Sequence, residues 1–167
     1  MPSFPPITVR QPQPHDIVDD PVVVCGVGVG FEGDVGAARV RDANGTALAQ
    51  VPIHAGGTGI WGNFHKAIML LGIPNAVNGT LEVYEVSQSG DGSELNKVVV
   101  PIIFGRKLVH PYHGFAQYTV LSGDSLSAIA NARYGNPSLW PRIFEANRDQ
   151  ITNPNLISPG QVLRIPQ

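Results

Sequence analysis

The chain has 167 residues, a length that suits one ordinary domain or two small ones. Hydrophobic residues make up 43% of it, which is enough to build a core and excludes wholesale disorder. Charged residues account for only 14% and the net charge is −2, so the sequence lacks the basic face that a nucleic-acid partner needs.

The first hundred residues alternate short apolar segments with turn residues, and the 19 glycines and 15 prolines of the chain favour this kind of organisation. Short strands separated by turns predict an antiparallel β-sandwich. The predicted strands are Ile7–Arg10, Val22–Val29, Val35–Asp42, Ala47–His54, Trp61–Leu70, Thr80–Ser87 and Leu95–Phe104.

Several of these elements carry more detailed signals. Asn44-Gly45 predicts a hairpin with a type I′ turn, in which both central residues take positive φ. Asn78-Gly79 and Gly90-Asp91-Gly92 predict two further turns. Alternate residues of Val22–Val29 are apolar on both faces, so we expect a central and largely buried strand there.

The stretch Gly105–Ala116 has no clean period and contains both glycine and proline. It predicts a linker between two domains. We therefore expect a sandwich domain at residues 1–104, a linker at 105–116 and a second domain at 117–167.

The rhythm after the linker is that of a small β-α-α-β domain. A strand at Gln117–Leu121 is followed by apolar residues at helical spacing, with Asp124 or Ser125 as a helix N-cap and Gly135 as the helix end. A second helix is predicted at Ser138–Asn147, with Pro141 in its first turn. After a loop, the last strand (Val162–Ile165) must pair antiparallel with the first to cover the helices.

This second domain closely resembles the LysM family along its whole length. The matching segments are Tyr118–Val120, Ser122–Ala130, Tyr134-Gly135, Ile143–Asn147 and Asn153–Pro166. Ser125 departs from the family pattern, where threonine is commoner, but it keeps the hydroxyl group.

The resemblance implies a binding function for a shallow groove between two loops. In LysM modules this groove holds glycans that contain N-acetylglucosamine, such as peptidoglycan or chitin. One wall would comprise Gly123, Asp124, Ser125 and Leu126, and the other Asn155, Leu156 and Ile157. Exposed backbone groups would bind the amide of the N-acetyl group, with Leu126 or Ile157 against its methyl. Alternatively, Asp124 and Ser125 serve only as helix caps, and Leu126 and Ile157 only as core.

The first domain resembles the immunoglobulin-like domain associated with bacterial sporulation and germination proteins. This resemblance implies an accessory role and brings no catalytic residues with it. The matching segments are Ile7–Val9, Pro21–Gly26, Phe31–Gly33, Val40–Asp42, Gly62–Phe64, Gly79–Tyr84 and Asp91–Glu94.

Other chemical motifs are incomplete. Gly26-Val-Gly28-Val-Gly30 lacks the spacing and the following helix of a dinucleotide loop. His110 and His113 have no metal-binding glutamate beside them, and Cys25 lies in an apolar strand without a base. Trp61 and Trp140 fit core or edge aromatics better than sugar-stacking ones. We therefore predict no catalytic residues, no metal and no cofactor.

Three functional hypotheses remain from the sequence. The first is a bacterial, non-catalytic protein that binds peptidoglycan or a related glycan. The second is a structural adaptor that docks to a protein assembly such as a contractile-tail baseplate, and the third is a cytosolic ion- or stress-responsive LysM protein.

The start of the chain bears on where these roles are carried out. It lacks the charged and apolar regions of a signal peptide, and no apolar run has the roughly 18–20 residues of a membrane span. We therefore expect a cytoplasmic location as the sequence reads, and a cell-envelope location if the natural precursor carries a leader peptide. The single cysteine, Cys25, excludes an internal disulfide.

Overall fold

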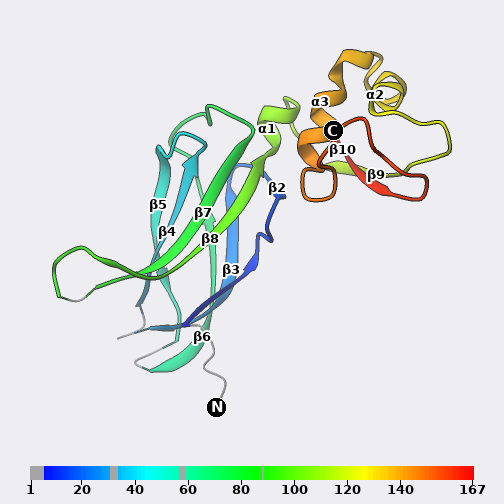
Figure 1. Ribbon diagram of the computed structural model, residues 1–167. Helices are drawn as coiled ribbons and strands as arrows, with labels where there is room; N and C mark the ends of the chain where they lie inside the picture. Colours follow the sequence, from blue (N-terminus) through cyan, green and yellow to red (C-terminus); the bar gives the residue numbers. More distant parts are fainter. Residues whose placement is uncertain (1–5, 31–33, 57–58, 88) are drawn as a thin grey trace.

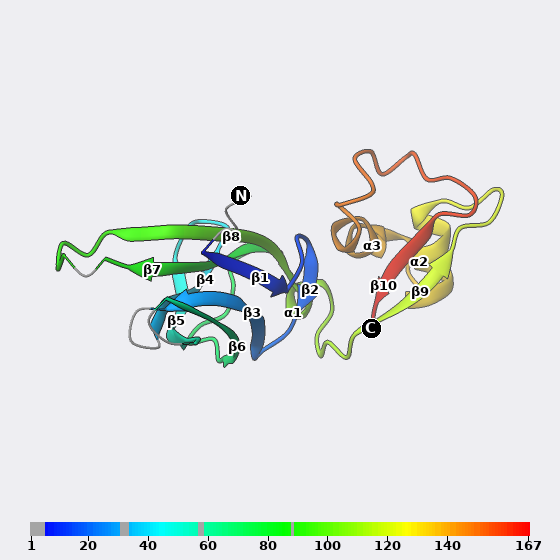
Figure 2. The ribbon, with the colours of Figure 1, turned by 90° about the horizontal axis from the view of Figure 1, so that it is seen from below.

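The computed structural model describes residues 6–30, 34–56, 59–87 and 89–167. A β-sandwich and a smaller domain of helices and strands lie end to end, joined beside the short helix α1 (Figures 1 and 2). The predicted fold class, an immunoglobulin-like sandwich followed by a small α+β domain, is confirmed.

Two sheets form the sandwich over the described residues. One has the strand order β1-β3-β6 and the other β2-β8-β7-β4-β5. Neighbouring strands are antiparallel, except that β2 runs parallel to β8. The strands are β1 (Ile7–Gln11), β2 (Asp16–Val18), β3 (Val22–Gly30), β4 (Asp34–Asp42), β5 (Ala47–His54), β6 (Ile60–Ile68), β7 (Asn78–Val86) and β8 (Glu94–Phe104).

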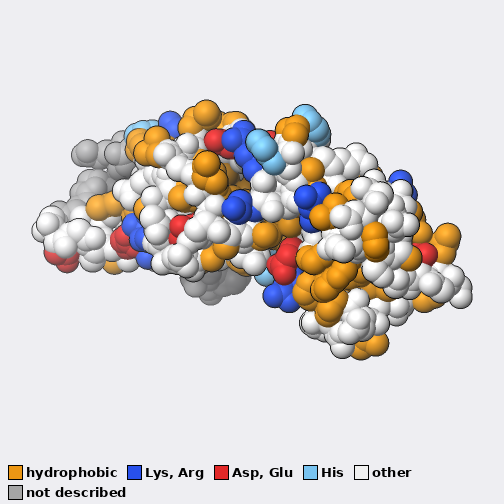
Figure 3. All heavy atoms as spheres, turned by 90° about the horizontal axis from the view of Figure 1, so that it is seen from above, with side chains coloured by type: hydrophobic (Ala, Val, Ile, Leu, Met, Phe, Trp, Pro, Cys, Tyr) orange, Lys and Arg blue, Asp and Glu red, His pale blue; other side chains and the backbone are white. Residues whose placement is uncertain are grey.

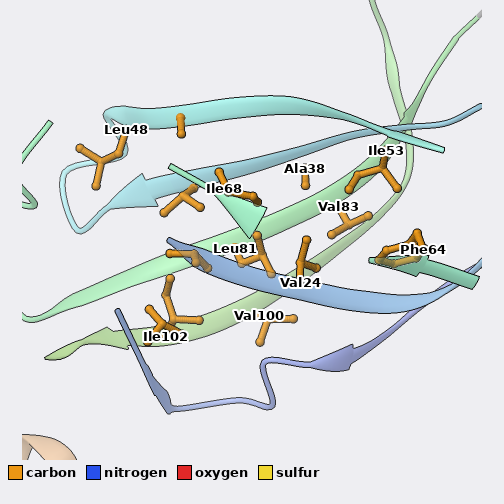
Figure 4. Packing of buried hydrophobic residues seen from close by; sticks show 14 of the residues in the cluster. Val24, Ala38, Leu48, Ile53, Phe64, Ile68, Leu81, Val83, Val100 and Ile102 are labelled. Carbon is orange, nitrogen blue, oxygen red and sulfur yellow. The ribbon is translucent and has the colours of Figure 1, made fainter. Parts of the chain in front are cut away.

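The sandwich core lies between the two sheets and follows the two-residue period of the strands. Val24 and Phe64 point inward from one sheet and meet side chains such as Leu81 and Val100 from the other (Figure 4). These apolar contacts hold the two sheets face to face.

Two features of the strands differ from expectation. Strand β3 is central in its sheet, but only one face is buried: Val22 and Val24 are fully buried, whereas Val23 is 41% exposed. A sandwich sheet packs on one side only, so an apolar outer face does not imply burial. Strand β2 was not predicted, because its three residues are too few to show a period.

The hairpin at Asn44-Gly45 is present, but its turn is not of type I′. Gly45 has a φ of 81° whereas Asn44 has a negative φ, and the Gly45 N–H donates to the Asp42 carbonyl over 3.0 Å. This is the longer hairpin connection in which only the glycine is left-handed. The buried Asp42 carboxylate stabilises it by accepting from the backbone N–H groups of Asn44 and Thr46.

The prediction of a turn at Asn78-Gly79 is wrong, because both residues belong to β7 and pair with β8. Glycine is needed there for space. A Cβ on Gly79 would lie 2.4 Å from Cε2 of Phe104 and 2.5 Å from the Arg41 carbonyl oxygen.

At the other predicted turn, Gly90 and Gly92 both have the positive φ that glycine favours. The segment Phe31–Gly33, which carried part of the family resemblance, lies outside the described residues.

The second domain has the predicted β-α-α-β order. Strand β9 (Phe115–Thr119) pairs antiparallel with β10 (Val162–Pro166), beginning two residues before its predicted start. Helix α2 (Leu126–Tyr134) ends at Gly135, which is left-handed with a φ of 69°. The 3₁₀ turn η1 (Pro137–Leu139) leads into α3 (Trp140–Ala146). Among the described residues, no helix has the length and apolar character needed to cross a membrane.

The segment expected to be a linker contains α1 (Gly105–Leu108) and packs against both domains. Leu108 forms a small buried cluster with Ile103 of β8 and Ala146 of α3. The Arg164 side chain of β10 adds a polar contact, since its Nη1 donates to the His15 carbonyl over 3.1 Å. The two domains therefore share an apolar contact as well as a covalent connection.

Candidate functional site

The loop between β9 and α2 is closed by the Asp124 carboxylate. Its Oδ2 accepts from the Leu121 N–H over 2.8 Å and from the Tyr118 hydroxyl over 2.7 Å. These two hydrogen bonds lower the pKa of Asp124, in that order of importance. The same bond to Asp124 raises the pKa of the Tyr118 hydroxyl. Asp124 therefore shapes the loop and is not the helix cap.

Ser125 is the N-cap of α2. Its backbone is extended and its Oγ accepts from the Ala128 N–H over 3.2 Å, satisfying one of the free donors of the first turn. This bond fixes where the helix begins. It thereby places Leu126 and Ser127 opposite the loop that precedes β10.

The loop before β10 is held by its own polar groups. Asn153 Oδ1 accepts from the Asn155 N–H over 3.0 Å, and the Asn153 carbonyl accepts from the Leu156 N–H over 3.0 Å. The Gly160 N–H donates to the Val120 carbonyl over 2.8 Å. This last bond ties the second loop to the end of β9, next to the first loop.

Between the two loops lies a shallow hollow of about 190 Å³. It brings together five of the predicted residues, Asp124, Ser125, Leu126, Asn155 and Ile157, from both predicted walls. Gly123 and Leu156 lie in the same loops, but they are exposed and do not line the hollow. The lining also includes Ser127 and Pro154, which the sequence did not indicate, and Trp140, which the sequence analysis assigned to the core or an edge rather than to sugar contact.

The apolar surface of the hollow differs from that expected. Leu126 is only 3% exposed and belongs to the core of the domain, so it forms the floor of the hollow. Ile157 and Trp140 are half-buried and are the apolar groups that a ligand can touch. The Trp140 ring is braced by Phe144, with the ring centres 6.1 Å apart. The sequence signal for a ligand-contacting role of Trp140 was an aromatic residue near the start of the second helix.

The hollow is polar and contains one carboxylate. Its polar groups are the hydroxyls of Ser125 and Ser127, the Asn155 amide and the Asp124 carboxylate. Asp124 already accepts two hydrogen bonds within the protein. The described lining residues include no histidine, lysine or cysteine, so they offer a ligand hydrogen bonds and apolar contact.

Over the described ranges, the histidines and the cysteine do not come together in a second site. Cys25 is half-buried, with its Sγ 3.9 Å from Oε1 of Gln11. Asp91 accepts from the N–H and hydroxyl of Ser93, as expected of a hairpin tip. Within the described part of the chain, no group of three or more histidine, cysteine, aspartate or glutamate residues could hold a metal ion.

The chain thus consists of a β-sandwich joined to a β-α-α-β module that carries this two-loop hollow. Its residues 6–93 match the family model of the immunoglobulin-like domain of bacterial spore germination, and residues 118–166 match that of the LysM domain. The first match spans more than half of the chain, so the chain belongs to that immunoglobulin-like family and carries a C-terminal LysM domain. Both predicted resemblances are confirmed.

Two curated relatives add context. The chain is 37% identical over 110 residues to the potassium binding protein Kbp of Escherichia coli O6:H1, a match that covers 58% of this chain and 74% of the relative. It is 46% identical over 61 residues to esterase Rv1288 of Mycobacterium tuberculosis, covering 36% of this chain but only 12% of the esterase. The short second match leaves most of the esterase without a counterpart here.

Proposed function

We propose that this protein binds a glycan containing N-acetylglucosamine, such as peptidoglycan or chitin, in the hollow of its LysM domain, and that it acts without catalysis. The observation that carries the proposal is the meeting of the two loops around one hollow, with polar groups beside Ile157 and Trp140.

The lining matches the chemistry of an N-acetyl sugar. The acetamido group has an N–H, a carbonyl and a methyl, which require an acceptor, a donor and an apolar contact. Asn155 and the two serine hydroxyls offer hydrogen bonds, while Ile157 and Trp140 offer apolar contact. One shallow hollow of this kind gives weak binding per module, so useful avidity requires repeated sugars or several modules.

The direct test is a titration of the isotope-labelled full chain with chitin oligomers, followed by amide chemical shifts. We expect saturable shifts concentrated at residues 124–127 and 155–157. Ile157→Ala should weaken binding about three- to tenfold, because it removes apolar contact. Val162→Ala is the matched control, since Val162 is 46% exposed on β10 and lies outside the hollow. Flat spectra at millimolar chitin and peptidoglycan fragments would contradict the proposal.

A second candidate, binding of potassium, is favoured by the similarity to the potassium binding protein Kbp. Potassium would be held by backbone and amide oxygens and would stabilise the folded state increasingly as its concentration exceeds the dissociation constant. Replacing potassium by sodium at constant ionic strength would then lower the melting temperature of the full chain. An unchanged melting temperature would count against this candidate.

A further inference from the structure

The hollow of the LysM domain carries an unbalanced charge. Among the described residues that line it, Asp124 is the one with a charged side chain, so the lining has a net charge of −1. The arginines of the domain all lie outside the lining; they are Arg133, Arg142, Arg148 and Arg164. Charged side chains are also sparse on the face of this domain that Figure 3 shows at the right. The hollow therefore presents a negative charge that its own walls do not balance.

The two oxygens of the Asp124 carboxylate have different surroundings. Oδ2 accepts from the Leu121 N–H and from the Tyr118 hydroxyl, and neither of these residues lines the hollow. Within the part of the chain that the structure describes, no hydrogen bond is made to Oδ1. The Asp124 side chain is half-buried, so a ligand can reach it. Oδ1 is thus the oxygen that remains for a ligand in the hollow.

The arginines of the domain do not neutralise this carboxylate. The Arg133 guanidinium lies over the Tyr118 ring, 5.1 Å from its centre, and Arg164 pairs with Asp149. Over the described ranges, Asp124 has no ion-pair partner. A cationic group of a ligand would therefore be the first opposite charge to contact the Asp124 carboxylate.

A glucosamine unit offers such a cationic group when its acetyl group is absent. The acetamido nitrogen of N-acetylglucosamine carries an N–H and no charge, whereas a free amine is protonated and positively charged below its pKa. Hydrogen bonds in which the groups are charged are roughly twice as strong as neutral ones. An ammonium therefore complements Oδ1 of Asp124 better than an acetamido N–H does.

We propose that Asp124 makes the hollow select glycans by charge, favouring an oligosaccharide of N-acetylglucosamine in which one sugar has lost its acetyl group over the fully acetylated form. The proposal rests on the glycan-binding function proposed above and names partly deacetylated glycans as the ligand class of that site. Ile157 and Trp140 contact the acetyl group of one sugar, while Oδ1 of Asp124 accepts from the ammonium of a neighbouring sugar. Asp124 and Ile157 belong to opposite loops, so one chain of sugars can meet both.

The test compares chitotetraose with the isomers that lack the acetyl group of a single sugar. Each is titrated into the isotope-labelled full chain at about pH 5.5, where the amine is protonated. The Asp124 carboxyl is ionised there, because hydrogen bonds from Leu121 and Tyr118 lower its pKa. We expect at least one isomer to bind about two- to fivefold more tightly than chitotetraose, as a partly exposed ion pair allows. That isomer should also give the larger shift of the Asp124 carboxyl carbon signal, and its advantage should shrink as the salt concentration rises.

A pair of variants assigns the preference to Asp124. Asp124→Asn removes the charge but keeps an oxygen that can accept from the Leu121 N–H and the Tyr118 hydroxyl. In this variant the affinity ratio of the isomer to chitotetraose should fall to about one. Asp91→Asn is the matched control, because the Asp91 carboxylate also accepts hydrogen bonds but is exposed at the far hairpin tip of the sandwich (Figure 1). Its affinity ratio should equal that of the unmodified chain.

Equal or weaker binding of every isomer would overturn the proposal. An advantage that persists in Asp124→Asn, or that disappears in Asp91→Asn, would overturn it as well. Failure of the charge selection is distinguishable from failure of the proposed function. Binding of chitotetraose without any isomer preference would leave the glycan site standing and overturn the charge selection alone, whereas no binding of any of these sugars at millimolar concentration would overturn both.

Discussion

At the scale of single residues, the Asn147 side chain links three segments of the LysM domain by hydrogen bonds. It is completely buried, and its amide nitrogen donates to the carbonyls of Ile143 and Arg164 over 2.7 and 2.8 Å. Its Oδ1 accepts from the Arg164 N–H over 2.8 Å and from the Gln150 amide over 3.0 Å. One side chain thus joins the end of α3 to β10 and to the loop that leads to the candidate site.

We predict that Asn147→Ala lowers the free energy of unfolding of the LysM domain by about 2–3 kcal/mol, because it leaves buried backbone groups without partners. Chemical denaturation of the full chain, followed at the β9 and β10 amide signals, measures this. Asn131→Ala is the matched control on exposed α2 surface and should change the free energy by less than about 0.5 kcal/mol. Equal effects of the two variants would show that the Asn147 bonds are not what holds α3 to β10.

At the scale of elements, an ion network crosses the outer face of the five-stranded sheet. Arg39 of β4 bonds Glu82 of β7 and Glu94 of β8, and Arg41 and Lys97 add further pairs. Hydrogen bonds from Arg39 and then Lys97 lower the pKa of Glu94 to about 2. Burial opposes ionisation of Glu82, but the bonds from Arg39 and Arg41 outweigh it and lower its pKa. The Arg39 guanidinium also lies over the buried Tyr84 ring, 4.8 Å from its centre.

These lowered pKa values predict acid sensitivity of the sandwich. A carboxyl whose pKa is lower in the folded state contributes stability that is complete above its unfolded pKa and disappears as the pH falls through its folded pKa. For Glu94 this window runs from its ordinary 4.5 down to about 2. The carboxyl carbon shift of Glu94 should therefore titrate near pH 2, and Glu94→Gln should make the loss of stability with acid shallower. A titration midpoint near 4.5 would contradict the network.

Sequence patterns predict some of these elements well and others poorly. The seven predicted strands and both LysM helices are present, because short apolar segments bounded by turn residues and apolar residues at helical spacing are local signals. The predictions that were wrong concern positions where tertiary contacts determine the residue type. Gly79 resembles a turn residue, yet it is glycine because Phe104 and the Arg41 carbonyl crowd its Cα. The two walls of the candidate site follow from the LysM motif, whereas Trp140 joins them only through the packing of α3 beside α2.

At the scale of the whole molecule, the contact between the domains decides how the candidate site is presented. Leu108 is 3% exposed and Ala146 is fully buried in their shared cluster with Ile103. Arg164 contacts the His15 carbonyl of the sandwich and pairs with Asp149 of its own domain. A cluster of this kind holds the LysM domain against the sandwich, so the candidate site has a defined orientation relative to the sandwich.

We expect both domains to tumble together, with one rotational correlation time from nitrogen-15 relaxation. Leu108→Asp should place a charge in the cluster and release the LysM domain, whose correlation time should fall toward that of a free module of its size. Lys107→Asp, on the exposed side of the same short helix, should leave the two values equal. Two different correlation times in the unmodified protein would show that the cluster does not couple the domains.

In the proposed complex, Ile157 and Trp140 receive the N-acetyl group of a glycan in the LysM hollow, and intermolecular nuclear Overhauser effects test this arrangement most directly. The measurement uses the full chain, isotope-labelled, with a chitin oligomer near saturation. We predict contacts from the acetyl methyl protons to the Ile157 side chain and the Trp140 ring, within the hollow that these residues line. Saturable binding with contacts to other surfaces, or no contacts at millimolar sugar, would contradict it.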